Sequence, residues 1–279
     1  MTVDQFKIYL FSSEFFSFYE GIWYSSNSTE LSYPNDGNED YFQIEENSFW
    51  FRHRNDCIIS VIKTYSPNQV FFDIGGGNGV VTKALEINKI QSVLIDPGKQ
   101  GVINAKSRKC DNIICGSLTD LHSLNGQLQS IGAFDVIEHI EDDIDFVNKI
   151  HDLLDISGML FITVPAYQFL WSNEDTDAGH FKRYSKKQII KVLEVNNFKV
   201  IYASYFFSIL LLPIFFARTL PSKLNHLFKV KNKSKDDHLQ IKGLFGKIIN
   251  SIWNWELKRI QNNKTIPFGS SCLIVARKY

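Results

Sequence analysis

A run of glycines between a predicted strand and a predicted helix constrains the fold of this chain more than any other feature. The run reads Asp-Ile-Gly-Gly-Gly-Asn-Gly over Asp73–Gly79, after the apolar segment Val70–Ile74 and before a helical pattern that starts at Val80. Glycines at such a junction let the backbone turn tightly and approach a ligand, while the helix start offers free N–H groups. We therefore expect a ligand-binding loop here; an ordinary strand-to-helix turn is the alternative.

The sequence after this loop alternates short β-rich segments with helical segments, which is typical of parallel strands joined by crossover helices. Seven strands are expected, at 70–74, 93–95, 113–115, 130–134, 159–164, 198–203 and 271–277. Helices are expected at 80–88, 102–107, 140–154 and 185–195. The predicted fold is α/β, a doubly wound, mainly parallel, seven-stranded sheet of the Rossmann-like kind. A nicotinamide-dinucleotide site is disfavoured, because its G-x-G-x-x-G fingerprint needs glycine where this chain has Val80.

The 279 residues divide into a core and its additions. Residues 1–66 are expected to form an N-terminal helical and loop extension, and residues 67–204 the ligand-binding α/β core. Residues 205–262 are expected to form a helical insertion, apolar at first and then basic. Residues 263–279 are expected to supply the final strand of the core. The chain is long enough to bury one such core.

Two motifs resemble those of class I S-adenosylmethionine-dependent methyltransferases. The first is the acidic residue and glycines of Asp73–Gly79, and the second is Asp96 at the end of Val-Leu-Ile-Asp-Pro. In that family the second motif binds both ribose hydroxyls of the cofactor. Ser117 stands where many relatives carry an aspartate that holds the adenine, and Gln129 replaces the usual acid of the fourth strand. The resemblance implies S-adenosylmethionine as cofactor, with these residues in contact: Asp73, Gly75, Gly77, Gly79, Asp96, Ser117 and Asp135.

Further along, the segments 133–140, 163–165 and 179–184 resemble a bacterial methyltransferase group that is common in polysaccharide and lipid pathways. In the first segment, Asp135, Glu138 and His139 stand at i, i+3 and i+4, so a helix that begins by Asp135 would present all three on one face. The triplet resembles the acidic-x-x-Glu-His element of small-RNA 2′-O-methyltransferases and ubiquinone-pathway O-methyltransferases, which holds a divalent cation. The RNA enzymes add a histidine from the region where this chain has His180.

The resemblance thus implies a metal site made of Asp135, Glu138, His139 and His180. Oxygen and imidazole donors without a thiolate suit Mg²⁺ or another divalent cation, which would lower the pKa of an acceptor hydroxyl. A metal-free site is the alternative, because Glu-His occurs at this place in many metal-free relatives. Then His139 or His180 is the candidate general base and Asp135 lines the cofactor pocket, so these three are the predicted catalytic residues.

Two segments are candidates for the acceptor pocket. An aromatic-basic element that relatives carry ahead of the first strand, where it could cover the cofactor or grip an anionic substrate, is matched here by Trp50, Phe51, Arg52 and Arg54. Trp50 and Arg52 are the predicted substrate contacts in it. A helix that packs its aromatic side chains on the core is the alternative, and His53 is expected to be exposed. The long loop after the fifth strand, where methyltransferases often build this pocket, contains Trp171, Asp175, Asp177, Arg183 and Tyr184. Arg183 and Tyr184 are the predicted substrate contacts in it.

The overall charge gives no attraction to nucleic acid, because 30 basic and 30 acidic residues balance. Locally, the apolar-rich segment Tyr205–Ala217 is followed by eight basic and two acidic residues between Arg218 and Lys247. The apolar segment is too short to span a bilayer, but the two segments together could seat the protein on an anionic membrane. A core or dimer helix followed by a solvated loop is the competing interpretation.

The predicted function is O-methylation of a small-molecule, sugar or lipid-linked acceptor, with or without a divalent cation. The alternatives are a metal-free N- or O-methyltransferase and a non-catalytic, membrane-associated partner with the same fold. Residues 1–20 lack the basic start and apolar core of a signal peptide, so a cytoplasmic location is expected, with peripheral contact at the inner membrane face left open. Four separated cysteines are expected to be buried thiols.

Overall fold

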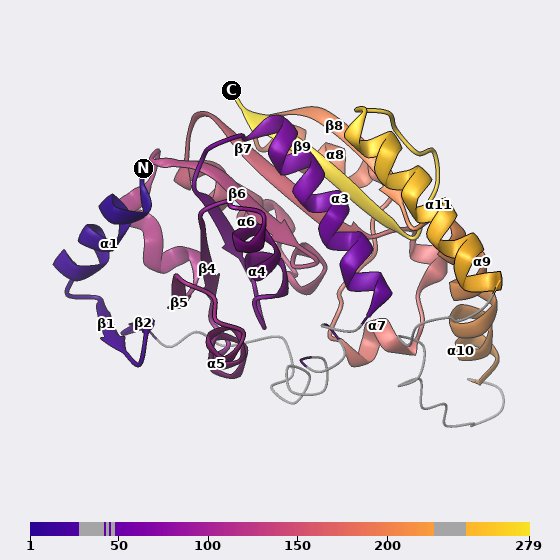
Figure 1. Ribbon diagram of the computed structural model, residues 1–279, viewed down its shortest axis with the longest axis horizontal. Coiled ribbons are helices and arrows are strands. Elements are labelled where there is room, and N and C mark those ends of the chain that lie inside the picture. The colour runs from indigo at the N-terminus through magenta and orange to yellow at the C-terminus, as the bar shows by residue number, and fades with distance from the viewer. Residues whose placement is uncertain (28–41, 43–44, 46–47, 226–243) are drawn as a thin grey trace.

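The computed structural model describes residues 1–27, 42, 45, 48–225 and 244–279 (Figure 1). The strands are β1 (Phe16–Tyr19), β2 (Ile22–Ser25), β3 (Phe71–Ile74), β4 (Ser92–Asp96), β5 (Ile113–Cys115), β6 (Leu128–Phe134), β7 (Leu154–Pro165), β8 (Phe198–Phe206) and β9 (Ser271–Lys278). The α-helices are α1 (Val3–Ser12), α3 (Phe49–Tyr65), α4 (Val80–Ile87), α5 (Lys99–Ser107), α6 (Asp143–Leu153), α7 (Asn173–Asp177), α8 (Lys186–Val195), α9 (Leu211–Ile214), α10 (Leu220–Asn225) and α11 (Leu244–Gln261). Short 3-10 turns are η1 (Leu118–Leu124), η2 (Ile137–His139), η3 (Gln168–Leu170) and η4 (Ser208–Leu210), and η5 (Phe215–Thr219) is a π-helical turn.

Within these residues the strands form one sheet in the order β1-β2-β5-β4-β3-β6-β7-β9-β8. The strands from β2 to β7 in this order are parallel, and β9 runs antiparallel to both of its neighbours. The α/β class and the doubly wound, mainly parallel sheet are confirmed. The sheet has nine strands rather than seven.

The two additional strands come from the N-terminal extension. From the sequence, this extension was expected to contain only helices and loops. Strands β1 and β2 form a hairpin whose two-residue turn is Glu20-Gly21, both with positive φ angles. Such turns match the twist of paired strands. Trp23 of β2 then pairs with Ile114 of β5, so the hairpin extends the sheet at that edge.

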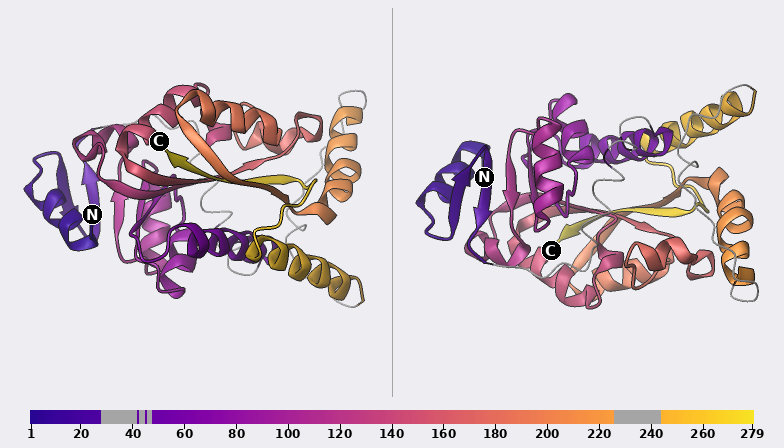
Figure 2. Two further views of the ribbon diagram at one scale, coloured as in Figure 1. Left: turned by 90° about the horizontal axis from the view of Figure 1, so that it is seen from above. Right: turned by 90° about the horizontal axis from the view of Figure 1, so that it is seen from below.

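The core lies on both faces of the sheet because side chains of buried strands alternate between them. In β7, Leu160, Ile162 and Val164 pack against the α1, α6 and α8 side, whereas Met159 and Phe161 pack against the α3, α4 and α11 side. Figure 2 shows the helices as two layers, with the N-terminal hairpin at one end of the molecule and α9 and α10 at the other. The fold is therefore a three-layer sandwich around the sheet.

Parallel strands end at the same edge of a sheet, and ligands of doubly wound folds bind at this carboxyl edge. The glycine loop follows β3, and Asp96 ends β4. Ser117 follows β5, and Asp135 follows β6. The fold thus brings the predicted cofactor residues to one edge from four adjacent strands.

The apolar segment Tyr205–Ala217 has two different environments. Tyr205, Phe206 and Phe207 are buried at the end of β8, which runs past the predicted end of this strand. The rest of the segment lies in α9 and η5, where no residue from Leu211 to Ala217 is buried. Residues 226–243, which carry most of the predicted basic segment, lie outside the described residues. Among the helices described, none combines the length and apolar character needed to cross a membrane.

Candidate active site

The glycine loop is shaped by three positive-φ glycines. Gly75 (φ 69°) lies against Val136, which an added Cβ would approach to 2.6 Å, and Gly79 (φ 75°) is the N-cap of α4. At Gly77 (φ 49°) an added Cβ would meet no atom within 4 Å, so open space lies in front of this glycine. The loop therefore packs against the segment after β6 on one side and leaves a cradle at its centre.

Asp96 lies beside this cradle and is fixed by two backbone donors. Gly77 N–H donates to Asp96 Oδ2 (2.9 Å), and Gly98 N–H donates to Asp96 Oδ1 (2.7 Å). Burial raises the pKa of Asp96, while the two backbone hydrogen bonds act in the opposite direction. Each carboxylate oxygen can accept more than one hydrogen bond, so Asp96 retains acceptor capacity for a hydroxyl.

Asp73 stabilises the loop through a hydrogen bond to α4. Its side chain is buried, and Thr82 Oγ1 donates to Asp73 Oδ2 (2.6 Å), which joins the end of β3 to the first turn of α4. Burial raises the pKa of Asp73 to about 6, although the hydrogen bond from Thr82 and the charge of Arg54 lower it. The structure thus gives Asp73 a contact within the loop itself, whereas Gly77 and Asp96 border the open space.

Ser117 caps the 3-10 turn that follows β5. Its N–H donates to Asp120 Oδ2 (2.7 Å), and its hydroxyl contacts Asp120 and Thr119. Asn27, from the N-terminal extension, donates to the other oxygen of Asp120 (2.7 Å). Position 117 lacks the aspartate that many relatives carry there. Asp120, three residues later, supplies a carboxylate that is hydrogen-bonded to Ser117.

Asp135 does not begin a helix, contrary to the sequence-based expectation. It adopts the left-handed conformation (φ 56°), η2 covers only Ile137–His139, and α6 starts at Asp143. The i, i+3, i+4 argument therefore fails, because no continuous helix joins the three side chains. Asp135 is held instead by Arg54 Nη2 (2.6 Å from Oδ2) and by the hydroxyl of Thr163 (3.1 Å from Oδ1).

Three of the four predicted metal ligands nevertheless come together. Glu138, His139 and His180 place one potential ligand atom each within 4.8 Å of one another, and Asp135 is not part of the group. The rings of His139 and His180 meet edge to face, with centroids 4.7 Å apart. Phe181 N–H donates to the carbonyl of Glu138 (2.7 Å), which brings the loop after β7 against η2.

Burial determines the protonation of two members of this group. Glu138 is buried, and its Oε2 has no hydrogen-bond partner among the described residues. Burial and the nearby charge of Asp135 raise the pKa of Glu138 well above its usual value. Burial and the neighbouring His180 lower the pKa of His139 to about 4. Without a bound cation, His139 is therefore neutral at neutral pH, and Glu138 keeps its proton to a higher pH than a free glutamate does.

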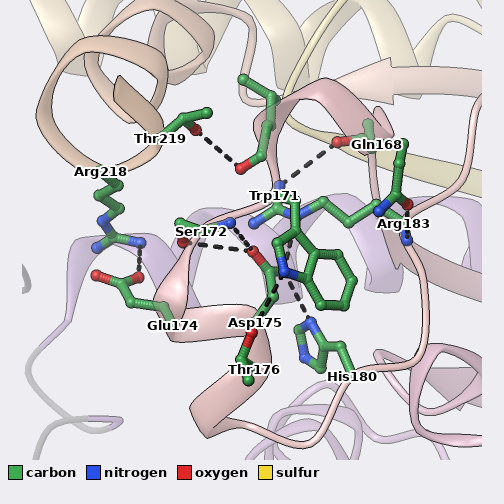
Figure 3. Close-up of polar contacts among 12 residues, drawn as sticks. Gln168, Trp171, Ser172, Glu174, Asp175, Thr176, His180, Arg183, Arg218 and Thr219 are labelled. Atoms are coloured by element: carbon green, nitrogen blue, oxygen red, sulfur yellow. Dashed lines mark hydrogen bonds and ion pairs between the residues drawn. The ribbon is translucent and has the colours of Figure 1, made fainter. Parts of the chain in front are cut away.

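His180 is oriented by a buried carboxylate. Figure 3 shows His180 and Arg183 directed at Asp175, whose Oδ1 lies 2.9 Å from His180 Nδ1 and accepts from Arg183 Nε (2.7 Å). Ser172 N–H donates to the other oxygen of Asp175 (2.8 Å), in a capping box at the start of α7. Burial by itself would raise the pKa of Asp175, but the hydrogen bonds from His180 and Arg183 lower it to about 2. Asp175 is thus ionised, so Nδ1 of His180 carries the proton and Nε2 is directed elsewhere.

The residues that were predicted to contact the acceptor lie in different environments. Tyr184 is buried, and its hydroxyl donates to Asp143 (2.8 Å), so it belongs to the core rather than to a pocket. Arg183 is engaged with Asp175 and with the carbonyl of Ala166 (3.4 Å). Trp50 is partly exposed and stacks on Phe207, with centroids 5.1 Å apart.

Arg52 is exposed on α3, whereas Arg54, two residues later, is buried and reaches Asp135. The expectation that His53 is exposed is wrong. It is buried, stacks on Trp253, and pairs with the buried Glu256 of α11 (Nε2 to Oε2, 2.8 Å). Glu256 also accepts from Phe207 N–H (3.0 Å), so the pair connects α3 and α11 with the end of β8.

Sequence reasoning placed Arg54 in the aromatic-basic element and Asp175 in the loop of the expected acceptor pocket, but it did not predict their contacts with Asp135 and His180, although signals for both residues exist. Arg54 precedes the buried Cys57 and Ile58 by three and four residues, so it belongs to the apolar stripe of α3 and Arg52 does not. Asp175 stands three residues after Ser172, which is the spacing of a capping box. Neither spacing shows what the side chain contacts, because Asp135 and His180 come from distant parts of the chain.

A family model described as a methyltransferase domain matches residues 51–203, which is more than half of the chain. The chain belongs to this methyltransferase-domain family. The match includes the glycine loop, Asp96 and the group around His180. It confirms the predicted class I family, the enzyme class and S-adenosylmethionine as the cofactor of this methyltransferase. No curated protein matches the chain.

Solved structures resemble this methyltransferase in fold at low sequence identity. A S-adenosylmethionine-dependent methyltransferase from Archaeoglobus fulgidus is 16% identical, with a TM-score of 0.52, over 85% of this chain and 99% of that one. Phosphoethanolamine N-methyltransferase 2 from Haemonchus contortus, solved with S-adenosylhomocysteine, is 17% identical, with a TM-score of 0.56, over 88% of this chain and 57% of that one. The [4+2]-cyclase SpnF is 13% identical, with a TM-score of 0.52, over 91% of this chain and 99% of that one. A cyclase among these structures shows that the fold alone does not determine the reaction.

Proposed function

We propose that this methyltransferase transfers a methyl group from S-adenosylmethionine to an oxygen atom of a small-molecule, sugar or lipid-linked acceptor. The observation that supports this most is the pair of Asp175 and His180 beside His139, at the carboxyl edge of the sheet. An imidazole oriented by a buried carboxylate is a general base for a hydroxyl. Val136, which lies against Gly75 of the cofactor loop, is three residues before His139, and the ring of His139 packs on that of His180, so this group connects the cofactor loop with the proposed base His180.

The residues at the cradle fit the cofactor. Gly77 faces open space, and Asp96 is fixed with spare acceptor capacity for ribose hydroxyls. When bound, the cofactor supplies an electrophilic methyl group on a positively charged sulfur. Asp135 and Arg54 form the wall after β6, and their ion pair holds the left-handed turn in place. The chain contributes chiefly position and orientation, which account for a large part of the rate in such displacements.

His180 accepts the acceptor's proton in this proposal. Asp175 takes the hydrogen bond of Nδ1–H, so the lone pair of a neutral imidazole is on Nε2. The negative charge of Asp175 then stabilises the imidazolium that forms. His139 remains neutral, because burial holds its pKa at about 4, and its edge packs on the ring of His180 and limits the orientations of that ring.

A divalent cation held by Glu138, His139 and His180 is the second candidate, and the specific observation in its favour is Glu138. A buried carboxyl oxygen with no hydrogen-bond partner among the described residues is costly, and coordination to a cation would satisfy it. Asp175 would orient His180 as carboxylates commonly orient metal-bound imidazoles. A cation there would lower the pKa of the acceptor hydroxyl.

The test is calorimetric titration of the purified protein with S-adenosylhomocysteine. We expect micromolar binding, and Asp96→Ala should weaken it at least about a hundredfold, because two hydrogen bonds from the ribose hydroxyls to a carboxyl group would be lost. Asp111→Ala, which changes an exposed aspartate before β5, serves as the matched control and should bind normally. Absence of binding to the wild-type protein would overturn the assignment of the cradle.

Titrations with Mg²⁺ and Mn²⁺ distinguish the metal-free reaction, with His180 as the base, from the metal-assisted reaction. Heat of cation binding that disappears in Glu138→Gln, together with loss of methyl transfer in chelator, would establish the metal-assisted reaction. Methyl transfer that survives chelator but is lost in His180→Ala would establish His180 as the base. A variant that retains cofactor binding but loses transfer distinguishes a defect in catalysis from a defect in folding.

A further inference from the structure

The segment formed by α9, η5 and α10 packs its polar side chains against the protein. Thr219 is buried, and its hydroxyl donates to the carbonyl of Leu170 (2.9 Å). Ser222 exchanges hydrogen bonds with Asn173, through Asn173 N–H (3.0 Å) and Asn173 Oδ1 (2.8 Å). Arg218 forms an ion pair with Glu174 (2.7 Å). Phe215 is half-buried and also packs against the protein, on Phe169, with ring centroids 6.3 Å apart. Both polar and apolar side chains therefore attach the segment, whereas a surface helix normally turns only polar side chains outward.

Further large apolar side chains of the same segment face outward. Leu212 is 62% exposed, Phe216 61% and Leu220 37%, and Pro213 and Ala217 are exposed as well. The three large side chains are spaced by four residues, and the π-helical turn between them lengthens the repeat, so the spacing keeps them on one side. We call these three exposed side chains the apolar stripe. The helices that carry them lie at the end of the molecule opposite the N-terminal hairpin (Figure 2).

The charged side chains carried by the segment itself are basic. Lys223 is exposed on α10, and Arg218 is half-buried and paired with Glu174 of α7. Leu211–Asn225 contains no aspartate or glutamate. An exposed lysine on the same helix as an apolar stripe is complementary to anionic lipid headgroups above an acyl layer.

The length of the segment fits a membrane surface rather than a span. Fifteen residues, Leu211–Asn225, make a helix about 22 Å long, whereas the hydrocarbon core of a bilayer is about 30 Å thick. A short helix with an apolar stripe and an exposed lysine lies in the interface plane, with the stripe at the headgroup and acyl boundary.

We propose that Leu212, Phe216 and Leu220 insert into the surface of an anionic lipid bilayer and dock the enzyme there, with Lys223 at the headgroups. The docking segment is bonded to the loop that presents His180, because Arg218 pairs with Glu174, next to Asp175 (Figure 3). Docking would therefore hold the loop that presents His180 close to the lipid surface, where an acceptor carried by or linked to lipid would lie. The docking itself does not depend on the proposed methyl transfer.

The first experiment is flotation of the full-length protein with vesicles of phosphatidylcholine, alone or mixed with phosphatidylglycerol. We expect binding to the anionic vesicles that weakens as salt is raised. Replacing Leu212, Phe216 and Leu220 by serine should lower the partition coefficient by about tenfold for each side chain, as expected for the loss of buried apolar area. Lys223→Glu should lower binding to anionic vesicles and leave the weak binding to neutral ones unchanged.

A matched control comes from the other end of the molecule. Phe11, Phe15 and Phe18 are also exposed, on α1 and β1. Their replacement by serine should leave flotation unchanged, and both triple variants should bind S-adenosylhomocysteine like the wild type if they are folded. Vesicle binding with failed cofactor binding in the wild type would refute the proposed function and leave the docking proposal standing.

Insertion can be measured by a single label, because the four native cysteines are all buried. An environment-sensitive fluorophore on Phe216→Cys should shift to the blue with anionic vesicles and be quenched by bromolipids, whereas the same label on Phe11→Cys should not. No vesicle binding at low salt would overturn the proposal. So would a blue shift without vesicles that depends on protein concentration, since it would show that a second copy or another protein covers the stripe.

Discussion

Asp175 is the residue on which the candidate site most depends. Its side chain is buried, yet it is ionised, because it accepts hydrogen bonds from His180, Arg183 and the N–H of Ser172. A carboxylate with several charge-assisted hydrogen bonds is strongly stabilised in its charged form. The same contacts that orient the imidazole therefore also stabilise the loop after β7.

Asp175→Asn tests this linkage through the pH dependence of stability. The pKa of Asp175 in the folded protein is about 2, below the 3.8 of a free side chain. A lowered pKa in the folded state means that the carboxylate stabilises the fold above about pH 4 and that this stabilisation is lost as the pH falls toward 2. The difference corresponds to about 2 kcal/mol, so the variant should unfold at lower urea concentration at pH 7, with a difference that shrinks toward pH 2.

Asp177→Asn is the control for this measurement, because Asp177 is exposed on the same short helix. It should change the free energy of unfolding little at any pH. Equal stability of Asp175→Asn and the wild-type protein at pH 7 would show that the carboxylate contributes nothing to the fold. Methyl transfer should fall in Asp175→Asn even at temperatures where the variant is fully folded, since the imidazole loses its orienting partner.

The sequence predicted the conformation or position of individual residues where these depend on neighbouring residues in the chain. Gly75, Gly77 and Gly79 have the positive φ angles that a glycine-rich turn implies, and Asp96 lies beside them as the second motif indicated. It did not predict the partners of Asp135 or of His180. Arg54 and Asp175 come from other elements, and the distances between such residues depend on packing that no local spacing encodes.

At the level of elements, the seven core strands were predictable because buried strands in parallel sheets are continuous apolar segments. The hairpin β1–β2 was missed because its aromatic residues were assigned to a helical region, although Glu20-Gly21 has the form of a two-residue hairpin turn. The helix after β6 begins later than expected because Asp135 and η2 intervene. Turn chemistry, rather than hydrophobic periodicity, determines both differences.

The contact of β8 with the segment before β9 allows a test at this level. Gly269 passes so close to β8 that an added Cβ would collide with the backbone carbonyl of Phe206. Because backbone cannot move aside like a side chain, Gly269→Ala should cost about 1–3 kcal/mol and lower the melting temperature by several degrees. Ser270→Ala, at the neighbouring buried position, should change it much less. Equal melting of Gly269→Ala and wild type in calorimetry would contradict the close approach.

For the whole molecule, the position of β9 between β7 and β8 makes the sheet depend on its last residues. Strand β8 has β9 as its partner, and β9 joins it to the rest of the sheet. A chain that ends at Ser270 should therefore lose cooperative thermal unfolding and bind a dye for exposed apolar surface. Removal of Tyr279 alone, an exposed residue after β9, should leave the transition unchanged. A cooperative transition within a few degrees of wild type in the shorter chain would contradict this dependence.

The same arrangement sets the order of events while the protein is being made. Phe206, at the end of β8, precedes Ser271, at the start of β9, by 65 residues. At about 5–20 residues per second, the ribosome needs roughly 3–13 s to synthesise that distance. During this interval the edge of β7 that β9 later covers is unpaired, and an apolar strand with an open edge is a template for other chains. Aggregation of this enzyme is thus a hazard of the nascent chain, which chaperones at the ribosome can reduce and extra stability in the finished fold cannot.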